Sequence, residues 1–294
     1  MSEQMTRTVK HPGPVNPDSV YFLPTRIKRI KERLESGVTL LDAFDRVLKK
    51  HGCKSAVAKL SPTRFWPAVY VLPALSRSSE HAVFYSDRHY PSSAMQVQLA
   101  TVTAGIKSGS TWIHCHARWT DGAGKLHCGH VLPDETVLMD PVELELALLV
   151  DAGFEVGPDQ ETNFSLFWPS TAAASTSIGD DSGLEHGWCI RMTPNHDLCS
   201  ELEHFVEKHV HKDVQVLGGV GSTIGAVFDD GRVVEPFVTE LLIENAHVSC
   251  HEGRCQAEVE ITLVDYMGGV NSGCLERMRN PILVTCEMVL AERS

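Results

Sequence analysis

The sequence contains no apolar run of about 18 residues, so we expect no membrane-spanning segment. The stretch from Met1 to Asn16 is polar and has no apolar signal-peptide core. The nine cysteines are an odd number and form no CxxC pair. Scattered cysteines of this kind are typical of free thiols in a reducing compartment, so we expect a cytoplasmic protein.

Positive charge is also scarce, since 26 lysines and arginines face 38 acidic residues and the formal net charge is −12. Binding to nucleic acid normally begins with a positive field that attracts the phosphates. The one dense basic run, Lys28, Arg29, Lys31 and Arg33, is interpreted as the solvated face of a short N-terminal helix. We therefore do not expect duplex DNA as a partner.

Two common catalytic motifs are missing. No serine lies in a GxSxG context, so a serine hydrolase is unsupported. The glycine-rich segment at 218–222 lacks the Lys-Ser/Thr of a phosphate-binding loop and is interpreted as a tight turn between strands.

An internal repeat is present in this chain of 294 residues. The segment His114–His130 (HCHARWTDGAGKLHCGH) aligns without a gap on Glu258–Cys274 (EVEITLVDYMGGVNSGC), at an offset of 144 residues. At the same offset Glu143 falls on Glu287. The alignment also matches an aspartate and two glycines of each segment: Asp121, Gly124 and Gly129 with Asp265, Gly268 and Gly273. Matched glycines indicate the same turn geometry, because glycine adopts positive φ at little cost.

Each repeat is predicted to open with a helix. The segment 39–50 has helical apolar spacing, with Thr39 and Asp42 as a capping signal, and a second helix is expected to open at Thr193-Pro194. Aligning the helices needs an offset of 158, which places about fourteen additional residues of the first repeat between Leu60 and Met95.

Short β-like segments follow each helix, so the predicted fold class is α+β: two tandem homologous domains, each a mostly antiparallel twisted sheet with one main helix packed on it. The expected boundaries are a loose leader over 1–22, a first domain over 23–169, a linker over 170–187 rich in Ser, Ala, Gly and Asp, and a second domain over 188–294.

Three histidines of the first repeat form a candidate metal site. His114 and His116 are two residues apart in a strand-like segment, so their rings point to the same face. His130 follows a DGAGK turn that is expected to fold the chain back beside them. Three imidazoles with one open coordination position are typical of a catalytic zinc site, although fifteen histidines in the chain leave chance spacing as the alternative.

Two further residues are candidates for catalysis. Arg118 shares the strand face of the histidines and is expected to hold a substrate carboxylate, with an exposed strand arginine as the alternative. Glu143 is the carboxylate chosen for proton transfer or as a fourth ligand, with an outward-facing strand position as the alternative.

In the second repeat the positions that match the three histidines are Glu258, Glu260 and Cys274. We interpret this set as a degenerate site whose fold was retained, with a second cation site as the alternative.

The segment from His114 to Leu146 resembles the plants-and-prokaryotes conserved (PPC) domain, also called DUF296, in which a strand with HxH is followed by a turn and Gly-Gly-His. Here Cys128-Gly129-His130 stands at the Gly-Gly-His position. The second repeat resembles the same family through the helix at 198–209 and the closing strand at 280–290. Together the two copies cover about residues 25–170 and 187–293. In plants this domain follows a DNA-binding AT-hook, and no RGRP-like hook occurs in this sequence.

The fold is also similar to that of acetolactate decarboxylase, an enzyme of two related halves that holds zinc through HxH and a later histidine. This resemblance implies that His114, His116 and His130 are the ligands. Acting together, these features predict a zinc-dependent or other metal-dependent lyase for a small oxo- or hydroxy-carboxylic acid, with stabilisation of an enediolate by the metal. The alternative is a non-catalytic PPC-type binding module, associated with DNA or regulators. With either function, the protein is expected to be a homo-oligomer, a dimer or a trimer.

Overall fold

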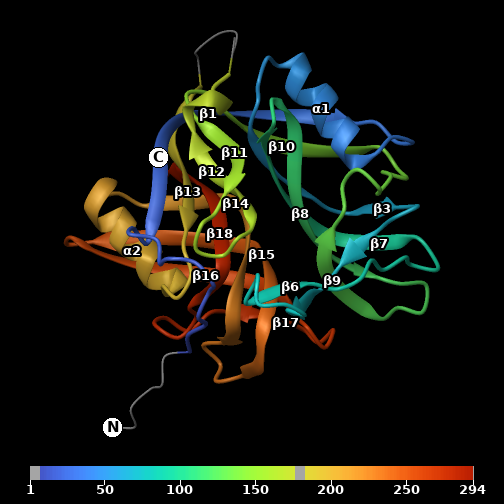
Figure 1. Ribbon diagram of the computed structural model, residues 1–294. Coiled ribbons are helices and arrows are strands. Elements are labelled where there is room, and N and C mark those ends of the chain that lie inside the picture. The colour runs from blue at the N-terminus through green and yellow to red at the C-terminus, as the bar shows by residue number, and fades with distance from the viewer. Residues whose placement is uncertain (1–6, 176–182, 294) are drawn as a thin grey trace.

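A computed structural model describes residues 7–175 and 183–293 of the chain. Within these residues are two α-helices and a 16-stranded sheet, and the short strands β5 (Pro73–Leu75) and β6 (Val83–Tyr85) pair separately as a hairpin (Figure 1). All pairs along the main path of the large sheet are antiparallel. The predicted mostly antiparallel sheet with two helices is therefore confirmed.

The main strands and helices follow one another in two similar series. The first series comprises β1 (Val20–Leu34), α1 (Leu40–Lys50), β2 (Ala56–Leu60), β7 (Met95–Lys107), β8 (Ser110–Thr120), β9 (Leu126–Val131) and β10 (Val142–Leu149). The second series comprises β13 (Glu185–Met192), α2 (Leu198–His209), β14 (Val214–Val227), β15 (Val233–His251), β16 (Arg254–Asp265), β17 (Val270–Cys274) and β18 (Ile282–Glu292). Shorter strands of the first half are β3 (Thr63–Phe65), β4 (Tyr70–Val71), β11 (Gly153–Pro158) and β12 (Ser165–Ser170), and a 3-10 turn spans Thr171–Ala173.

The two series pair in the same order. The path β1-β10-β2-β7-β8-β9 on one side is matched by β13-β18-β14-β15-β16-β17 on the other, and β1 pairs with β13 at the centre. Because one continuous sheet contains both series, the division into two domains remains a prediction.

The aligned hairpins share the same register. His116 pairs with His130 across β8 and β9, and Glu260 pairs with Cys274 across β16 and β17. In each turn the aspartate accepts a backbone hydrogen bond from the glycine three residues later and donates one to the residue four positions later. These glycines, Gly124 and Gly268, have φ of 79° and 82°. The matched glycines therefore supply the same left-handed turn position at both places.

The helices cover separate cores. Thr39 caps α1 as predicted, since its side chain accepts a hydrogen bond from the backbone N–H of Asp42. The second helix starts later than expected, at Leu198, because Asp197 is its cap and Asn195 adopts a φ of 65° before it. In Figure 1 the two helices lie on opposite sides of the molecule, α1 at upper right and α2 at left.

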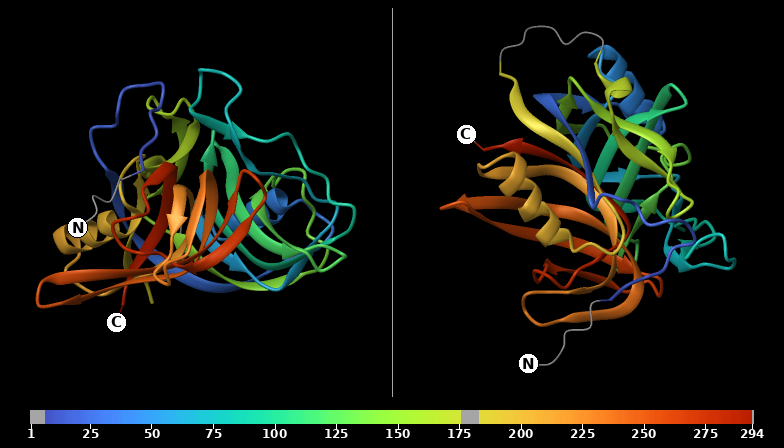
Figure 2. Two further views of the ribbon diagram at one scale, coloured as in Figure 1. Left: turned by 90° about the horizontal axis from the view of Figure 1, so that it is seen from below. Right: turned by 60° about the vertical axis from the view of Figure 1, so that its left-hand side comes forward.

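The sheet faces that carry no helix pack against each other. A Cβ placed on Gly218 of β14 would lie 3.1 Å from Cβ of Val57 on β2. Lys59 of β2 donates a hydrogen bond from Nζ to the backbone oxygen of Glu244 on β15, at 2.7 Å. The strands of the two halves curve around this shared interior (Figure 2). Residues far apart in sequence thus meet between the two halves.

Several expectations about local structure were wrong. The basic run lies on strand β1 rather than a helix, and Arg29 forms ion pairs there with Glu145 and Glu185. The glycine-rich segment 218–222 is inside β14 and is not a turn. In both places strand pairing with distant segments overrides the local pattern.

The terminal leader and the linker also differ from expectation. Residues 7–19 are not loose, since Arg7 donates to the backbone oxygen of Val234 at 2.8 Å and His11 is buried. The linker predicted over 170–187 begins in β12 and ends in β13, and its residues 176–182 lie outside the described residues.

Cys250 and Cys255 form a disulfide across the β15–β16 hairpin, which corrects the expectation of free thiols for this pair. The other seven cysteines are free. Among the described residues, no helix has the length and apolar character needed to cross a membrane.

Candidate metal centre

Strand β8 directs two of the three candidate histidines away from α1. Its odd-numbered residues from Ile113 to Trp119 are buried in the core that α1 covers. His114 and His116 alternate with them, so their rings point to the opposite face, toward the second half. The sequence prediction that the two rings share one face is confirmed.

The three predicted histidines lie together. One ligand atom from each of His114, His116 and His130 falls within 4.8 Å of the others, and Nε2 of His114 is 3.1 Å from Nε2 of His116. Two nitrogens bound to one tetrahedral zinc at 2.0–2.1 Å would lie about 3.3 Å apart. The spacing of this pair therefore fits a shared metal ion.

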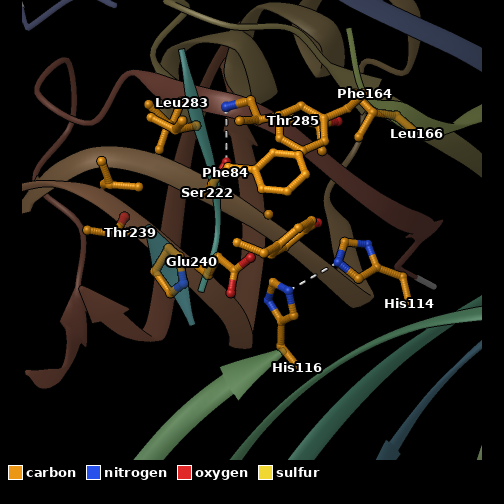
Figure 3. Close-up of a pocket in the computed structure, with 16 residues that line it drawn as sticks. Phe84, His114, His116, Phe164, Leu166, Ser222, Thr239, Glu240, Leu283 and Thr285 are labelled. Carbon is orange, nitrogen blue, oxygen red and sulfur yellow. Dashed lines mark hydrogen bonds between the residues drawn. The ribbon is translucent and has the colours of Figure 1, made fainter. Parts of the chain in front are cut away.

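The second nitrogen of two rings is held by the other half of the chain. His116 donates from Nδ1 to the backbone oxygen of Leu241 on β15, at 2.7 Å. His114 forms a hydrogen bond from Nδ1 to the carboxylate of Glu287 on β18. These contacts leave the Nε2 lone pairs of both rings directed at the cluster, as in histidines that bind metals. In Figure 3 the two rings face each other.

His130 completes the donor set. Its Nδ1 is buried and has no hydrogen-bond partner among the described residues. Burial, followed by the neighbouring charge of His114, holds the pKa of His116 and of His130 well below its usual value. Both rings are therefore neutral at neutral pH, which is the form that binds a metal ion. Donor chemistry, orientation and the orphaned nitrogen together fit a divalent transition metal.

His114 is different because a carboxylate faces it. Burial lowers its pKa, but the charge and hydrogen bond of Glu287 outweigh burial and raise the pKa above its usual value. The Glu287 carboxylate therefore makes His114 the most basic ring of the cluster.

A second carboxylate lies beside the cluster. Glu240 on β15 is buried, and its Oε2 has no hydrogen-bond partner in the described part of the chain. Burial raises its pKa to about 8, an effect that His114 partly offsets. Figure 3 shows its carboxylate next to the ring of His116. Glu240 is thus a buried carboxylic acid at the site.

Two cavities meet at the cluster. The inner cavity, of about 40 Å³, is mostly apolar and reaches His114, His116 and Glu240. Its apolar wall comes from both halves: Val83, Phe84, Phe164, Leu166, Val238 and Leu283. The outer cavity, of about 200 Å³, reaches His114 and His130 from the other side and is lined by Lys107, Trp112 and Glu287.

Tyr85 lines both cavities. It belongs to the β5–β6 hairpin, which lies within the region where the sequence placed the additional residues of the first repeat. Burial, with the charges of Glu240 and Glu287, raises the pKa of its phenol, so the hydroxyl stays protonated. The hairpin thus brings a hydrogen-bond donor to the cluster.

Arg118 and Glu143 do not take the expected places. Arg118 donates from Nη1 to Glu244 at 2.5 Å and to Thr262 at 3.1 Å, and it lines neither cavity. Glu143 is exposed on β10 opposite Arg33. The structure thus brings the three histidines together and leaves both of these side chains outside, because Arg118 is neutralised by Glu244 and Glu143 faces solvent.

The matching positions of the second half are not gathered into a site. Glu258 and Glu260 are exposed on β16, and Cys274 is half-buried on β17. Among the described residues, the histidine triad is the one group of metal-binding side chains close enough to share an ion.

Four residues of the site were missed from the sequence: Tyr85, Lys107, Glu240 and Glu287. The alignment did contain a signal for Glu287, since it is the counterpart of Glu143. The other three had no motif.

No protein-family model matches the chain, and no curated protein sequence matches it. Among solved structures, a plant- and prokaryote-conserved (PPC) protein of Pyrococcus horikoshii is 14% identical, with a TM-score of 0.40, over 49% of this chain and 94% of that protein. A metal-containing protein of Archaeoglobus fulgidus is 14% identical, with a TM-score of 0.38, over 55% of this chain and 98% of that protein.

Proposed function

We propose that His114, His116 and His130 bind one divalent transition metal ion, preferably zinc, and that the chain is a metal-dependent lyase for small oxo- or hydroxy-carboxylic acids. The observation that carries the proposal is the pair of Nε2 atoms 3.1 Å apart, with each ring held from behind by the second half. A metal bound there supplies a Lewis acid that polarises a carbonyl or hydroxyl oxygen of the substrate.

The surrounding residues provide the rest of a lyase site. Glu287 and the backbone oxygen of Leu241 fix the orientation of two rings, which maintains the spacing of the donor atoms. The walls of the inner cavity are mostly apolar, and a less polar environment strengthens electrostatic interactions inside it.

Glu240 is the proton donor in this proposal, in place of Glu143. When a carbon–carbon bond to a carboxylate breaks, carbon dioxide leaves and the electron pair stays on the substrate carbon. A proton from Glu240 Oε2 neutralises that carbon. Its pKa of about 8 keeps the acid protonated at neutral pH, and a nearby cation would lower that pKa toward neutrality. An acid near the working pH both holds and releases a proton efficiently.

We further propose that the chain arose by tandem duplication of a PPC-type (DUF296) unit with a site resembling that of acetolactate decarboxylase. The repeated strand order and the equal register of the two hairpins support the duplication. In this proposal the second half lost its histidines and instead contributes Glu240 and Glu287 to the site of the first. Its partners are small acids rather than DNA, consistent with the net charge of −12. A homo-oligomer, dimer or trimer, remains part of the proposal.

The proposal is tested by metal analysis and a substrate screen on the purified full chain. We expect close to one zinc or cobalt ion per chain, loss of that ion in His116→Ala, and turnover of at least one oxo- or hydroxy-acid by the metal-loaded protein. His127→Ala is the matched control, because His127 lies on the same hairpin but pairs with Asp121 outside the cluster. Absence of metal would contradict the whole proposal, whereas metal binding without turnover of any acid would support the binding-module alternative.

A further inference from the structure

The outer cavity contains a cation that the proposed chemistry has not used. Lys107 is the last residue of β7 and lines this cavity together with His114, His130 and Glu287. Its Nζ lies over the ring of Trp112, 4.4 Å from the centroid. No carboxylate pairs with it among the described residues, whereas Arg118 is neutralised by Glu244.

The position of Lys107 relative to the histidines follows from the strand. Trp112 and His114 are two residues apart on the same face of β8, which corresponds to about 7 Å along the strand. The ammonium sits over Trp112, and Lys107 lines the same cavity as His114 and His130. A small acid in this cavity can therefore place its carboxylate at Lys107 and another oxygen at the cluster.

The inner cavity offers an apolar surface for the part of the ligand that carries no charge. It joins the outer cavity at Tyr85, His114 and Leu166, which line both. Its volume of about 40 Å³ corresponds to roughly three water molecules. An apolar wall of this size fits a short alkyl group.

We propose that Lys107 is the carboxylate-binding residue of this site, and that the ligand is a small α-hydroxy or α-oxo acid whose short branched alkyl group enters the inner cavity. This inference rests on the proposed function, since the oxygen next to the carboxylate is directed to the histidine cluster. The aromatic ring under the ammonium fixes the position of the charge, because a cation is attracted to the face of an indole.

The test uses the full chain loaded with Co²⁺, whose visible absorption changes when a ligand enters its coordination sphere. The probes are α-hydroxyisovalerate and its uncharged methyl ester, titrated into wild type, Lys107→Met and Lys107→Arg. Lys125→Met is the matched control, since Lys125 is an exposed lysine in the β8–β9 turn. Cobalt content is measured for every variant.

We expect Lys107→Met to lower the affinity for the acid about tenfold or more, because a charge-assisted contact is lost. Its affinity for the ester and its cobalt content should equal those of wild type, and Lys107→Arg should retain most of the affinity for the acid. Wild type should also bind α-hydroxyisovalerate more tightly than glycolate, which lacks the alkyl group.

Three outcomes would overturn the inference while leaving the metal site intact. These are cobalt binding with no response to either probe, an acid affinity in Lys107→Met within twofold of wild type, and equal affinities for glycolate and α-hydroxyisovalerate. Failure of wild type to bind cobalt would instead overturn the proposed function on which the inference rests.

Discussion

Glu287, on the last strand of the chain, accepts a hydrogen bond from Nδ1 of His114, which lies 173 residues earlier on β8. Its carboxylate is almost fully buried, so the contact is made away from solvent. A carboxylate behind a histidine fixes the tautomer of the ring and increases the basicity of its other nitrogen. The second half of the chain thus controls a donor atom of the first.

Replacing Glu287 with Gln should weaken metal binding. The amide keeps the size of the side chain but removes the negative charge behind His114, and loss of such an outer partner typically lowers metal affinity about 10- to 100-fold. Titration with zinc in competition with a chelator measures the effect. Glu143→Gln is the control, because this residue is the sequence counterpart of Glu287 but is exposed on β10. Equal zinc affinity in the Glu287 variant and wild type would contradict the assigned role.

The buried pair between Arg191 and Asp159 should be important for stability. Both side chains are fully buried, and the guanidinium also stacks on Trp168, 3.8 Å from the ring centroid. Asp159→Asn removes the carboxylate that is hydrogen-bonded to the buried arginine, which should lower the free energy of unfolding by about 3–5 kcal/mol in urea. Asp151→Asn removes the exposed pair with Arg26 and should cost about 1 kcal/mol or less. If both variants lose a similar amount of the free energy of unfolding, burial of the Arg191–Asp159 pair does not determine its contribution to stability.

Glu32 should make folding sensitive to acid. Hydrogen bonds from Lys50 and His51 lower the pKa of its carboxyl from 4.5 to about 2. Because the folded-state pKa is depressed, the stabilisation is complete above 4.5 and is lost as the pH falls through about 2. Lys50 is largely exposed, so solvent screening limits the effect to about 1 kcal/mol.

The measurement for Glu32 is the free energy of unfolding of Glu32→Gln and wild type at several pH values. The two proteins should differ at neutral pH and converge in acid. Glu35→Gln is the control, since Glu35 is exposed and lies 3.9 Å from Arg33. If the difference in the free energy of unfolding between wild type and Glu32→Gln does not become smaller in acid, the carboxylate charge is not the cause of that difference.

The sequence predicted those features that depend on local pattern. The cap at Thr39, the common face of His114 and His116 and the return of His130 all follow from residue spacing within one helix or hairpin. The basic run of β1 was wrongly interpreted as a helix face, because pairing with the distant strands β10 and β13 holds the segment extended.

The remainder of the site depends on packing between the two halves. Glu240, Glu287 and Lys107 have no motif of their own, and each is placed by how a strand faces the other half. The choice of Glu143 shows the problem directly, because the offset of 144 identified the correct pair of aligned positions. Sequence spacing could not indicate that the carboxylate at the histidines comes from the second half of the chain.

The central claim is that one metal ion is held by the three histidines of the first half. Anomalous diffraction at the zinc absorption edge, from crystals of the zinc-loaded protein, tests it most directly. We predict one peak per chain, about 2.0–2.1 Å from a ring nitrogen of each of His114, His116 and His130. No peak at these rings, or a peak at Glu258, Glu260 and Cys274 instead, would contradict the claim.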